Sequence, residues 1–180
     1  MIGRVVWITG LSGAGKTTLA SALVESLSTV ERAVVLLDGD ELRKIFAVNT
    51  SNSENYSRDG RITLALQYSR LCMLLAKQGF TVVIATISLF KEIHSWNRAN
   101  LPNYFEVYLK VPVEELRRRD PKGIYRRFFA GQLTDVAGLD VPIDEPEAAD
   151  WVVEFESGRP ATVLAEDCLR KLCKSPPDLC

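Results

Sequence analysis

The stretch from Arg4 to Thr18, RVVWITGLSGAGKTT, decides the fold. It joins a short run of β-branched and aromatic residues to a glycine-rich turn, a lysine and two threonines. The second part matches the pattern G-x-x-x-x-G-K-[ST] in the setting that this pattern requires, with a strand before it and a helix, expected over 15–28, after it. The stretch therefore predicts a phosphate-binding loop (P-loop) between the first strand and the first helix of an α/β domain.

The residue types of this loop indicate its chemistry. Its glycines let successive backbone N–H groups point at phosphate oxygens, and the positive N-terminus of the following helix faces the same place. Lys16 supplies a point charge for the β- and γ-phosphates of a nucleoside triphosphate, and Thr17 offers its hydroxyl to Mg²⁺. A glycine-rich turn with an exposed lysine is the plain structural alternative. The residues predicted to bind ATP here are Gly10, Ser12, Gly13, Ala14, Gly15, Lys16, Thr17 and Thr18.

The rest of the chain alternates strand-like and helix-like segments. Strands are expected at 4–9, 33–38, 80–86, 104–110 and 151–155. Helices are expected over 15–28, 40–47, 59–78, 91–99, 113–120 and 160–173. Near-continuous apolar strands that alternate with helices indicate a parallel sheet covered on both faces, because right-handed crossovers place helices on each side. We predict one P-loop NTPase-type α/β domain over 1–175, a three-layer α/β/α sandwich with a parallel five-stranded sheet, and a short tail at 176–180.

Composition narrows the class of protein. Charged residues make up 25% of the 180 residues and apolar residues 47%, which is ordinary for a globular domain. The formal net charge of −1 gives no reason to expect a nucleic-acid partner. Four cysteines without a C-x-x-C pair, beside a single histidine, favour neither a disulfide framework nor a zinc site. With no apolar run near membrane-spanning length, we expect a cytoplasmic protein without a membrane partner.

Two loops are longer than compact packing requires. One covers 48–57 and is polar; the other covers 121–147 and is rich in glycine, proline and charged residues. Long loops at the carboxyl ends of parallel strands are usually functional, and a decorative insertion is the alternative.

The expected second strand ends in LLDGDELR, which carries two aspartates. Asp38 and Asp40 would project from the carboxyl end of the strand toward the P-loop, where carboxylates hold Mg²⁺ or accept a proton from a substrate hydroxyl. Asp40 as a mere helix N-cap is the alternative. Arg43, one turn further on, faces the same cleft as an anion ligand or is an exposed helical arginine. The predicted catalytic residues are thus Lys16, Asp38 and Asp40, and the predicted metal ligands are Thr17 and Asp38.

In their order along about residues 4–155, these motifs resemble those of the adenylylsulfate (APS) kinases, P-loop enzymes that phosphorylate the ribose 3′-hydroxyl of adenosine 5′-phosphosulfate. GLSGAGKTT is similar to the family's P-loop, LDGDELR to its L-D-G-D-x-x-R, and YSRDGR to its F-S-x-x-D-R. ISLF is similar to I-S-P-[FY], and RDPKGIY to R-D-x-K-G-L-Y. AGQLTDVAGLDVPIDEP resembles A-G-x-I-x-x-F-T-G-I-D-x-P-Y-E-x-P. The resemblance implies a kinase that uses ATP and Mg²⁺ and acts on a small nucleotide.

Further roles follow from the resemblance alone. It implies that Asp40 or Asp38 is the base, that Tyr56 replaces a Phe that stacks near the acceptor base, and that Arg119 lies near the adenine of ATP. It makes 121–147 a mobile lid over ATP, and a homodimer is compatible with it, since members of the family often dimerise. The residues that it implies for the acceptor are Asp40, Arg43, Tyr56, Arg61, Ile87, Ser88, Leu89, Lys122, Gly123, Tyr125 and Val136.

The sequence departs from the family on the acceptor side. Leu64 stands where the family has a substrate-binding Asn, Val136 where an aromatic residue would sandwich adenine, Ile143 where it has Tyr, and Phe129 where it has Arg. A site that lacks such partners favours a different acceptor. The pattern also resembles APS-kinase-like proteins of surface-polysaccharide pathways that phosphorylate a cytidine-linked phosphoramidate. The segment KEIHSWNR (91–98) matches none of the APS kinase motifs.

Three functions are weighed against one another. The first is an ATP-dependent kinase of a nucleotide acceptor, either adenylyl sulfate or, as the alternative, a compound such as cytidine diphosphoramidate. The second is a GTPase switch, which the missing N-K-x-D motif disfavours. The third is a non-catalytic nucleotide-binding partner, which the intact Lys16, Thr17 and aspartate pair disfavour. We expect poor activity on adenylyl sulfate and better activity on the cytidine compound.

Overall fold

The structure, a computed structural model, describes residues 2–46 and 56–173. Its strands form one five-stranded sheet in the order β2-β3-β1-β4-β5, and every pair of neighbours is parallel. The strands are β1 (Arg4–Gly10), β2 (Val34–Asp38), β3 (Thr81–Thr86), β4 (Tyr104–Lys110) and β5 (Trp151–Glu154). The predicted parallel sheet is confirmed. Nearly all of the loop predicted at 48–57 and all of the tail at 176–180 lie outside the described residues.

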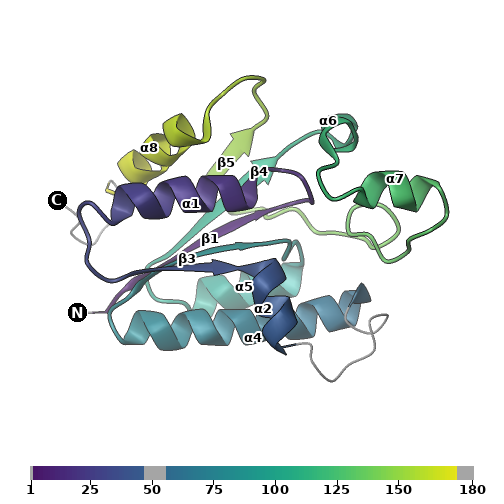
Figure 1. The fold of residues 1–180 in the computed structure, drawn as a ribbon. Helices are drawn as coiled ribbons and strands as arrows, with labels where there is room; N and C mark the ends of the chain where they lie inside the picture. Colours follow the sequence, from purple (N-terminus) through teal and green to yellow (C-terminus); the bar gives the residue numbers. More distant parts are fainter. Residues whose placement is uncertain (1, 47–55, 174–180) are drawn as a thin grey trace.

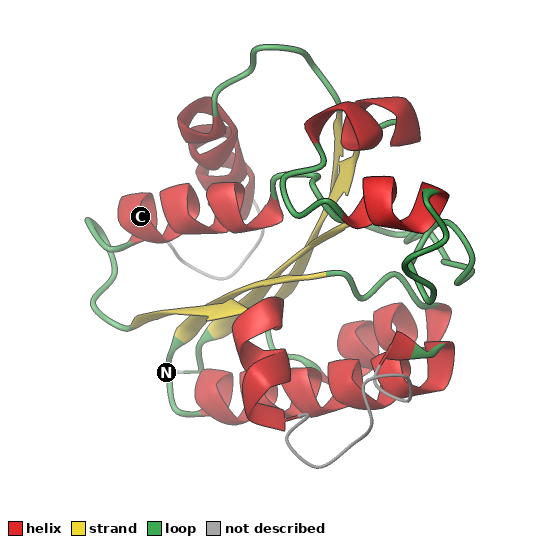
Figure 2. Cartoon of the chain, turned by 45° about the vertical axis from the view of Figure 1, so that its right-hand side comes forward, coloured by secondary structure: helices red, strands yellow, loops and turns green. Residues whose placement is uncertain are grey.

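Helices cover both faces of the sheet (Figures 1 and 2). On one face lie α1 (Lys16–Leu27) and α8 (Ala161–Leu172), which pack against each other. On the other face lie α4 (Arg58–Lys77) and α5 (Lys91–Asn100), with α2 (Gly39–Phe46) between α4 and the sheet edge formed by β2. The predicted three-layer sandwich is confirmed. Within the described ranges, every helix is too short or too polar to cross a membrane.

The core follows from the alternation of side chains along the buried strands. All seven residues of β1 are buried, and successive side chains point to opposite faces of a strand. Val6 and Ile8 join an apolar cluster beneath α1 and α8, whereas Val5 and Trp7 join a second cluster beneath α4 and α5. The central strand is therefore held from both sides, which fixes the P-loop that follows it.

The segment 121–147 is not the plain loop that the sequence suggested. It contains a short helix, α7 (Ile124–Phe129), which follows α6 (Val113–Arg119) and Gly123. Gly123 has a φ of 64°, in the left-handed region that favours glycine. The carboxylate of Asp120 accepts hydrogen bonds from the backbone N–H groups of Tyr125 and Arg126 at 3.2 and 3.0 Å, so it caps the helix from outside. Both helices lie beyond the carboxyl ends of the strands (Figure 1).

Candidate active site

A cavity of about 1010 Å³ opens at the carboxyl ends of β1, β2 and β3. Parallel sheets of this type bind ligands at that edge. Most residues predicted for the site line this one cavity. They are Ser12, Gly13, Gly15, Lys16, Thr17, Thr18, Asp38, Asp40, Arg43, Tyr56, Arg61, Ile87, Arg119, Lys122 and Val136.

Two predicted ATP-binding residues and two predicted acceptor residues support the cavity without lining it. Ala14 closes the P-loop turn, because its N–H donates to the carbonyl of Leu11 at 3.2 Å, and Gly10 lies at the end of β1. Tyr125 is buried and donates its hydroxyl to the carbonyl of Ser12 at 3.0 Å, so it fastens α7 to the P-loop. Gly123 precedes α7 as its N-cap residue.

Two residues that were predicted to contact the acceptor, Ser88 and Leu89, do not line the cavity. Leu89 is fully buried in the core beneath α1, and Ser88 is buried with its hydroxyl 3.1 Å from that of Thr86. The reason is a tight turn after β3, in which the N–H of Leu89 donates to the carbonyl of Ile87 at 2.9 Å and directs the chain inward. Of the stretch 87–89, only Ile87 lines the cavity.

The P-loop lysine is half-buried. Gly13 and Gly15 adopt φ values of 79° and 96°, which let the backbone wrap around the place where phosphate oxygens bind. The Nζ of Lys16 donates a hydrogen bond to the carbonyl of Leu11 at 2.7 Å. Burial, helped by repulsion from the nearby Lys122, lowers the pKa of Lys16 to about 8. An anion in the cavity would offset both effects, so the loop is electrostatically prepared for phosphate.

Asp38 links the P-loop to the second strand. Its Oδ2 accepts a hydrogen bond from the hydroxyl of Thr17 at 2.7 Å, and its Oδ1 accepts one from the N–H of Asp40 at 2.9 Å. The alternative that Asp40 is the N-cap of α2 is therefore wrong, since α2 begins at Gly39 and Asp38 accepts the N–H. A hydroxyl and a carboxylate that meet in an open cavity are the ligand types that Mg²⁺ prefers.

Asp40 lines the same cavity and pairs with the 121–147 segment. Its Oδ2 accepts a hydrogen bond from the Nζ of Lys122. Burial alone would raise the pKa of Asp40, but the hydrogen bond and charge of Lys122, with Lys16 and Arg43, hold it below its usual value. The carboxylate is thus ionised and held by a side chain that a ligand anion could draw away.

The far end of the cavity combines an aromatic ring with two arginines. The guanidinium carbons of Arg43 and Arg61 lie 4.7 and 5.3 Å from the centroid of the Tyr56 ring. Arg61 also donates to the carbonyls of Tyr56 and Asp135, both at 2.7 Å, and so ties α4 to the segment 133–137. Burial, with the positive charge of Arg43, lowers the pKa of Arg61 to about 10. The arrangement suits a flat ring that bears an anionic substituent.

The four positions at which the sequence departs from the family lie in different places in the structure. Leu64 is buried in the cluster beneath α4, and Ile143 packs against the opposite cluster, so neither lines the cavity. Val136 does line it. Phe129 is 55% exposed, and the guanidinium carbon of Arg117 lies 4.2 Å from its ring centroid, whereas Arg127 lines the cavity two residues earlier. Of these four positions, Val136 is therefore the one that reaches the ligand space.

Several cavity residues were not predicted from the sequence. They are Gly39, Ala85, Thr86, Pro121, Ile124, Arg127, Leu133, Thr134, Asp135 and Ala137. Most come from 121–137, where Pro121, Thr134 and Asp135 occupy variable positions of the family pattern and so gave no signal. The remainder lie at the carboxyl ends of β2 and β3, where the position alone could have indicated them.

A second, smaller cavity of about 250 Å³ lies on the other side of the P-loop. It shares Gly15, Thr18 and Arg119 with the main cavity. The guanidinium carbon of Arg119 lies 4.9 Å from the ring centroid of Phe155, which also lines this space. A flat, partly apolar slot beside a phosphate loop suits a nucleobase.

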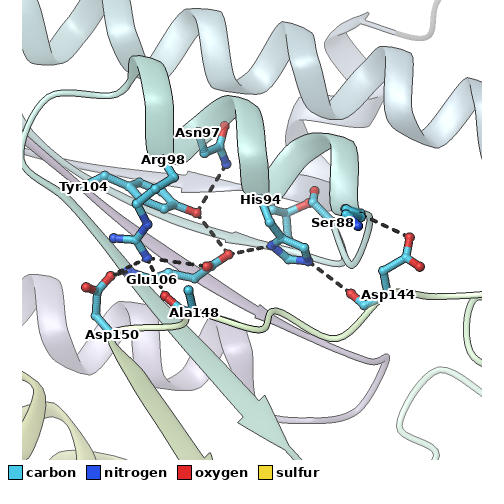
Figure 3. Close-up of polar contacts among 11 residues, drawn as sticks. Ser88, His94, Asn97, Arg98, Tyr104, Glu106, Asp144, Ala148 and Asp150 are labelled. Atoms are coloured by element: carbon cyan, nitrogen blue, oxygen red, sulfur yellow. Dashed lines mark hydrogen bonds and ion pairs between the residues drawn. The ribbon is translucent and has the colours of Figure 1, made fainter.

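A polar cluster between α5 and β4 holds the end of the 121–147 segment in place (Figure 3). At its centre, Glu106 of β4 is 3% exposed, and its Oε1 lies 2.7 Å from Nδ1 of His94. The other ring nitrogen of His94 lies 3.1 Å from the carbonyl oxygen of Asp144. Asp150 accepts the N–H of Glu106 at 2.7 Å and forms an ion pair with Arg98 at 2.8 Å. The stretch 91–98 therefore anchors the chain that leaves the cavity.

Comparison with protein families gives a match over most of the chain. The family model described as adenylylsulphate kinase matches residues 2–154. Among curated proteins, a cytidine diphosphoramidate kinase of Campylobacter jejuni is 41% identical over 144 residues, which are 80% of this chain and 82% of the relative. An adenylyl-sulfate kinase of Deinococcus deserti is 42% identical over 148 residues, or 82% of this chain and 80% of the relative.

Comparison with solved structures agrees with this family match. The APS kinase CysC of Mycobacterium tuberculosis, in complex with AMPPNP and APS, superposes with a TM-score of 0.82 at 30% identity. The match covers 94% of this chain and 97% of the other.

Proposed function

Because the chain belongs to the adenylylsulphate kinase family, and is thereby an ATP-dependent phosphotransferase that acts on a hydroxyl group, we propose that it phosphorylates a ribose hydroxyl of a nucleotide that carries an anionic 5′ substituent. One observation carries this proposal. A single cavity holds the P-loop with Lys16 at one end and Arg43, Tyr56 and Arg61 at the other, with Asp40 among its lining residues. Donor and acceptor then share one space, which holds the reacting groups close together.

In this proposal the side chains divide the work of transfer. Lys16 neutralises charge on the transferred phosphoryl group. Asp40 accepts the proton of the attacking hydroxyl, which requires that it first leave Lys122. An acceptor anion that binds Lys122, Arg43 and Arg61 would release Asp40, so the base becomes free when the acceptor is in place.

Mg²⁺ belongs to the proposal as the ion that accompanies ATP. The Thr17 hydroxyl and the Asp38 carboxylate, 2.7 Å apart, fit it as hard oxygen ligands, and phosphates and waters complete its shell. When bound, it shields the charge of the β- and γ-phosphates. The residues 121–147 and the second cavity complete the ATP side, with Arg119 and Phe155 beside the adenine.

The acceptor is either of the two that the relatives' names specify. Adenylyl sulfate is supported by the adenylyl-sulfate kinase of Deinococcus deserti and by the solved complex that contains APS. Cytidine diphosphoramidate is the second candidate, supported by the Campylobacter jejuni relative and by Val136, whose small side chain offers little stacking surface. A pyrimidine, smaller than adenine, depends less on a second aromatic face.

The proposal is tested by the release of ADP with each acceptor in turn. A kinase gives release that depends on the acceptor, and the product carries a new phosphate on its ribose. A non-catalytic nucleotide-binding protein binds ATP without release, and an ATPase releases ADP at the same rate with and without acceptor. The three outcomes separate the functions considered above.

We also propose a single catalytic domain that works in the cytoplasm and forms a homodimer. Within the residues that the structure describes, Cys72 and Cys168 are buried thiols outside any disulfide bond, which suits a reducing compartment. Light scattering of the purified chain measures its assembly state directly. A monomer at micromolar concentration would contradict the dimer and leave the catalytic proposal unaffected.

A further inference from the structure

We propose that Asp135 selects the nucleobase of the acceptor by accepting a hydrogen bond from an exocyclic amino group. The inference rests on the proposed function and deepens it. Asp135 lines the main cavity beside Leu133 and Val136, at the end where Tyr56 and Arg61 also lie. A slot with an aromatic ring, apolar walls and one carboxylate has the composition of a nucleobase pocket.

The backbone of Asp135 is held in a conformation that residues other than glycine seldom adopt. Its φ is 60°. Its N–H donates to Asp140 at 2.8 Å, and its carbonyl accepts from Arg61 at 2.7 Å. The N–H of Val136 also donates to Asp140, at 2.6 Å. Both backbone groups of Asp135 are thus satisfied within the protein, and the side chain stands on a rigid turn.

The carboxylate keeps acceptor capacity for a ligand. One of its oxygens, Oδ2, accepts the hydroxyl of the neighbouring Thr134 at 3.0 Å, and the positive charge of Arg61 acts on the same carboxylate. An ionised carboxylate can only accept hydrogen bonds, and its two oxygens offer about four sites. Asp135 can therefore hold an N–H donor of a ligand while it keeps its contacts to the protein.

This chemistry divides nucleobases by their exocyclic groups. Adenine and cytosine present an amino group next to a ring nitrogen acceptor, whereas hypoxanthine and uracil present a carbonyl oxygen at the same place. The amino group donates to Asp135. The carbonyl oxygen would face the carboxylate with like partial charge and leave it without a donor, which costs binding. Both acceptors under consideration carry an amino group, so Asp135 would serve either.

A purely conformational role for Asp135 is the competing explanation, because aspartate, asparagine and glycine all tolerate this φ. Two variants separate the roles. Asp135→Asn and Asp135→Gly keep the turn and remove the negative charge. Asp59→Asn is the matched control, since Asp59 is exposed in the first turn of α4 and does not line the cavity.

The experiment compares amino and oxo acceptors on the full chain with ATP. kcat/KM is measured for adenylyl sulfate against its inosine counterpart, and for cytidine diphosphoramidate against its uridine counterpart. Since a hydrogen bond to a charged group discriminates by roughly 10- to 100-fold, the wild type and Asp59→Asn should favour the amino acceptor by that factor. Asp135→Asn and Asp135→Gly should bring the ratio to within roughly threefold of unity. A ratio unchanged in both variants would overturn the proposal and leave the kinase assignment standing.

A binding measurement gives a second test that does not depend on turnover. Calorimetry with the nonhydrolysable ATP analogue present compares CMP with UMP and AMP with IMP. If no acceptor is phosphorylated but amino nucleotides bind more tightly in an Asp135-dependent way, the selection stands and the proposed function fails. If binding shows no preference either, both fail.

Discussion

The hydroxyl of Thr17 donates a hydrogen bond to Oδ2 of Asp38 at 2.7 Å, so the first turn of α1 and the carboxyl end of β2 meet at one point in the cavity. The two residues stand 21 positions apart in the chain, and only the parallel pairing of the strands brings them together. In the proposed function this pair holds Mg²⁺ beside the β- and γ-phosphates.

Thr17→Ala should therefore raise the Mg²⁺ concentration required for half-maximal turnover by roughly tenfold or more, since it removes one oxygen ligand. Thr17→Ser keeps the hydroxyl and should behave like the wild type. Chelation of the metal should abolish turnover in all three proteins. The test is a Mg²⁺ titration of the initial rate, and an unchanged requirement in Thr17→Ala would contradict the metal assignment.

Lys16 should make nucleotide binding sensitive to pH. Its pKa is lowered from 10.5 to about 8 by burial and by Lys122, and the bound nucleotide needs the charged form. Affinity for a nonhydrolysable ATP analogue should be flat below pH 7 and fall by up to tenfold per unit above about pH 8. Because the folded chain binds fewer protons than the unfolded chain between about 8 and 10.5, Lys16 favours stability increasingly as the pH rises through that window.

Calorimetry between pH 6.5 and pH 9.5 measures both the affinity and the protons taken up, within the range where the fold is expected to persist. Lys16→Ala should bind weakly with little pH dependence and lose roughly 10²–10⁴-fold in kcat. A wild-type affinity that is constant across this range would show that Lys16 does not contact the phosphates.

Asp40→Asn should leave ATP binding intact and reduce phosphoryl transfer by roughly 10²–10⁴-fold, because the amide keeps the shape but cannot take the proton. Asp38→Asn should instead raise the Mg²⁺ requirement. Single-turnover kinetics at saturating ATP separate the two effects. If Asp38→Asn loses transfer at high Mg²⁺ while Asp40→Asn retains it, the two roles are exchanged.

The segment 121–147 should behave as two parts rather than one mobile lid. Its first part carries Lys122, Arg126 and Arg127, which trypsin cleaves, and we expect cleavage there in the free protein and protection with ATP and Mg²⁺. Its second part, held through Asp140 and by the cluster around Glu106, should resist a protease that cuts after acidic residues in both states.

Glu106→Gln tests the anchor. It weakens the contacts of Glu106 to His94 and Arg98, so the acidic sites near Asp144 should become cleavable while the tryptic pattern stays the same. Equal tryptic cleavage with and without nucleotide would count against closure of the first part, and a Glu106→Gln variant with unchanged resistance would count against the anchor.

Much of this architecture could be predicted from the sequence because it depends on local patterns. The runs around Trp7 and Ile84 are nearly continuously apolar, which indicates strands buried on both faces. The P-loop pattern requires a strand before it and a helix after it, so it predicts both neighbouring elements. The helix α7 was not predicted because its sequence carries little local signal. It spans only 124–129, and its capping carboxylate, Asp120, precedes it by more residues than a usual N-cap.

The acceptor side could be predicted less well because it depends on tertiary placement. Leu64 and Ile143 were expected in the acceptor pocket by analogy with family positions, but helix rotation and loop path direct them into the core. Glu106 gave no signal, since its partner Asp150 lies 44 residues away. Asp135 occupies a variable position of the motif, and only the cavity reveals it.

Because Leu64 and Ile143 lie outside the cavity, only the substitution at Val136 contributes to the expected preference for the cytidine compound. With Val136 as the substituted position that reaches the cavity, one stacking face is lost, and stacking is worth on the order of 1–3 kcal/mol per base. We therefore expect adenylyl sulfate to be phosphorylated, with a kcat/KM roughly tenfold or more below that of cytidine diphosphoramidate.

The central claim is that the chain phosphorylates a nucleotide acceptor in the cavity between the P-loop and Tyr56, and it is tested most directly by ADP release with each acceptor side by side. The account predicts release that depends on the acceptor, a new ribose phosphate in the product, and the higher kcat/KM for the cytidine compound. A kcat/KM for adenylyl sulfate at or above about 10⁶ M⁻¹s⁻¹, with no turnover of the cytidine compound, would overturn the preference. ADP release that neither acceptor changes would contradict the claim itself.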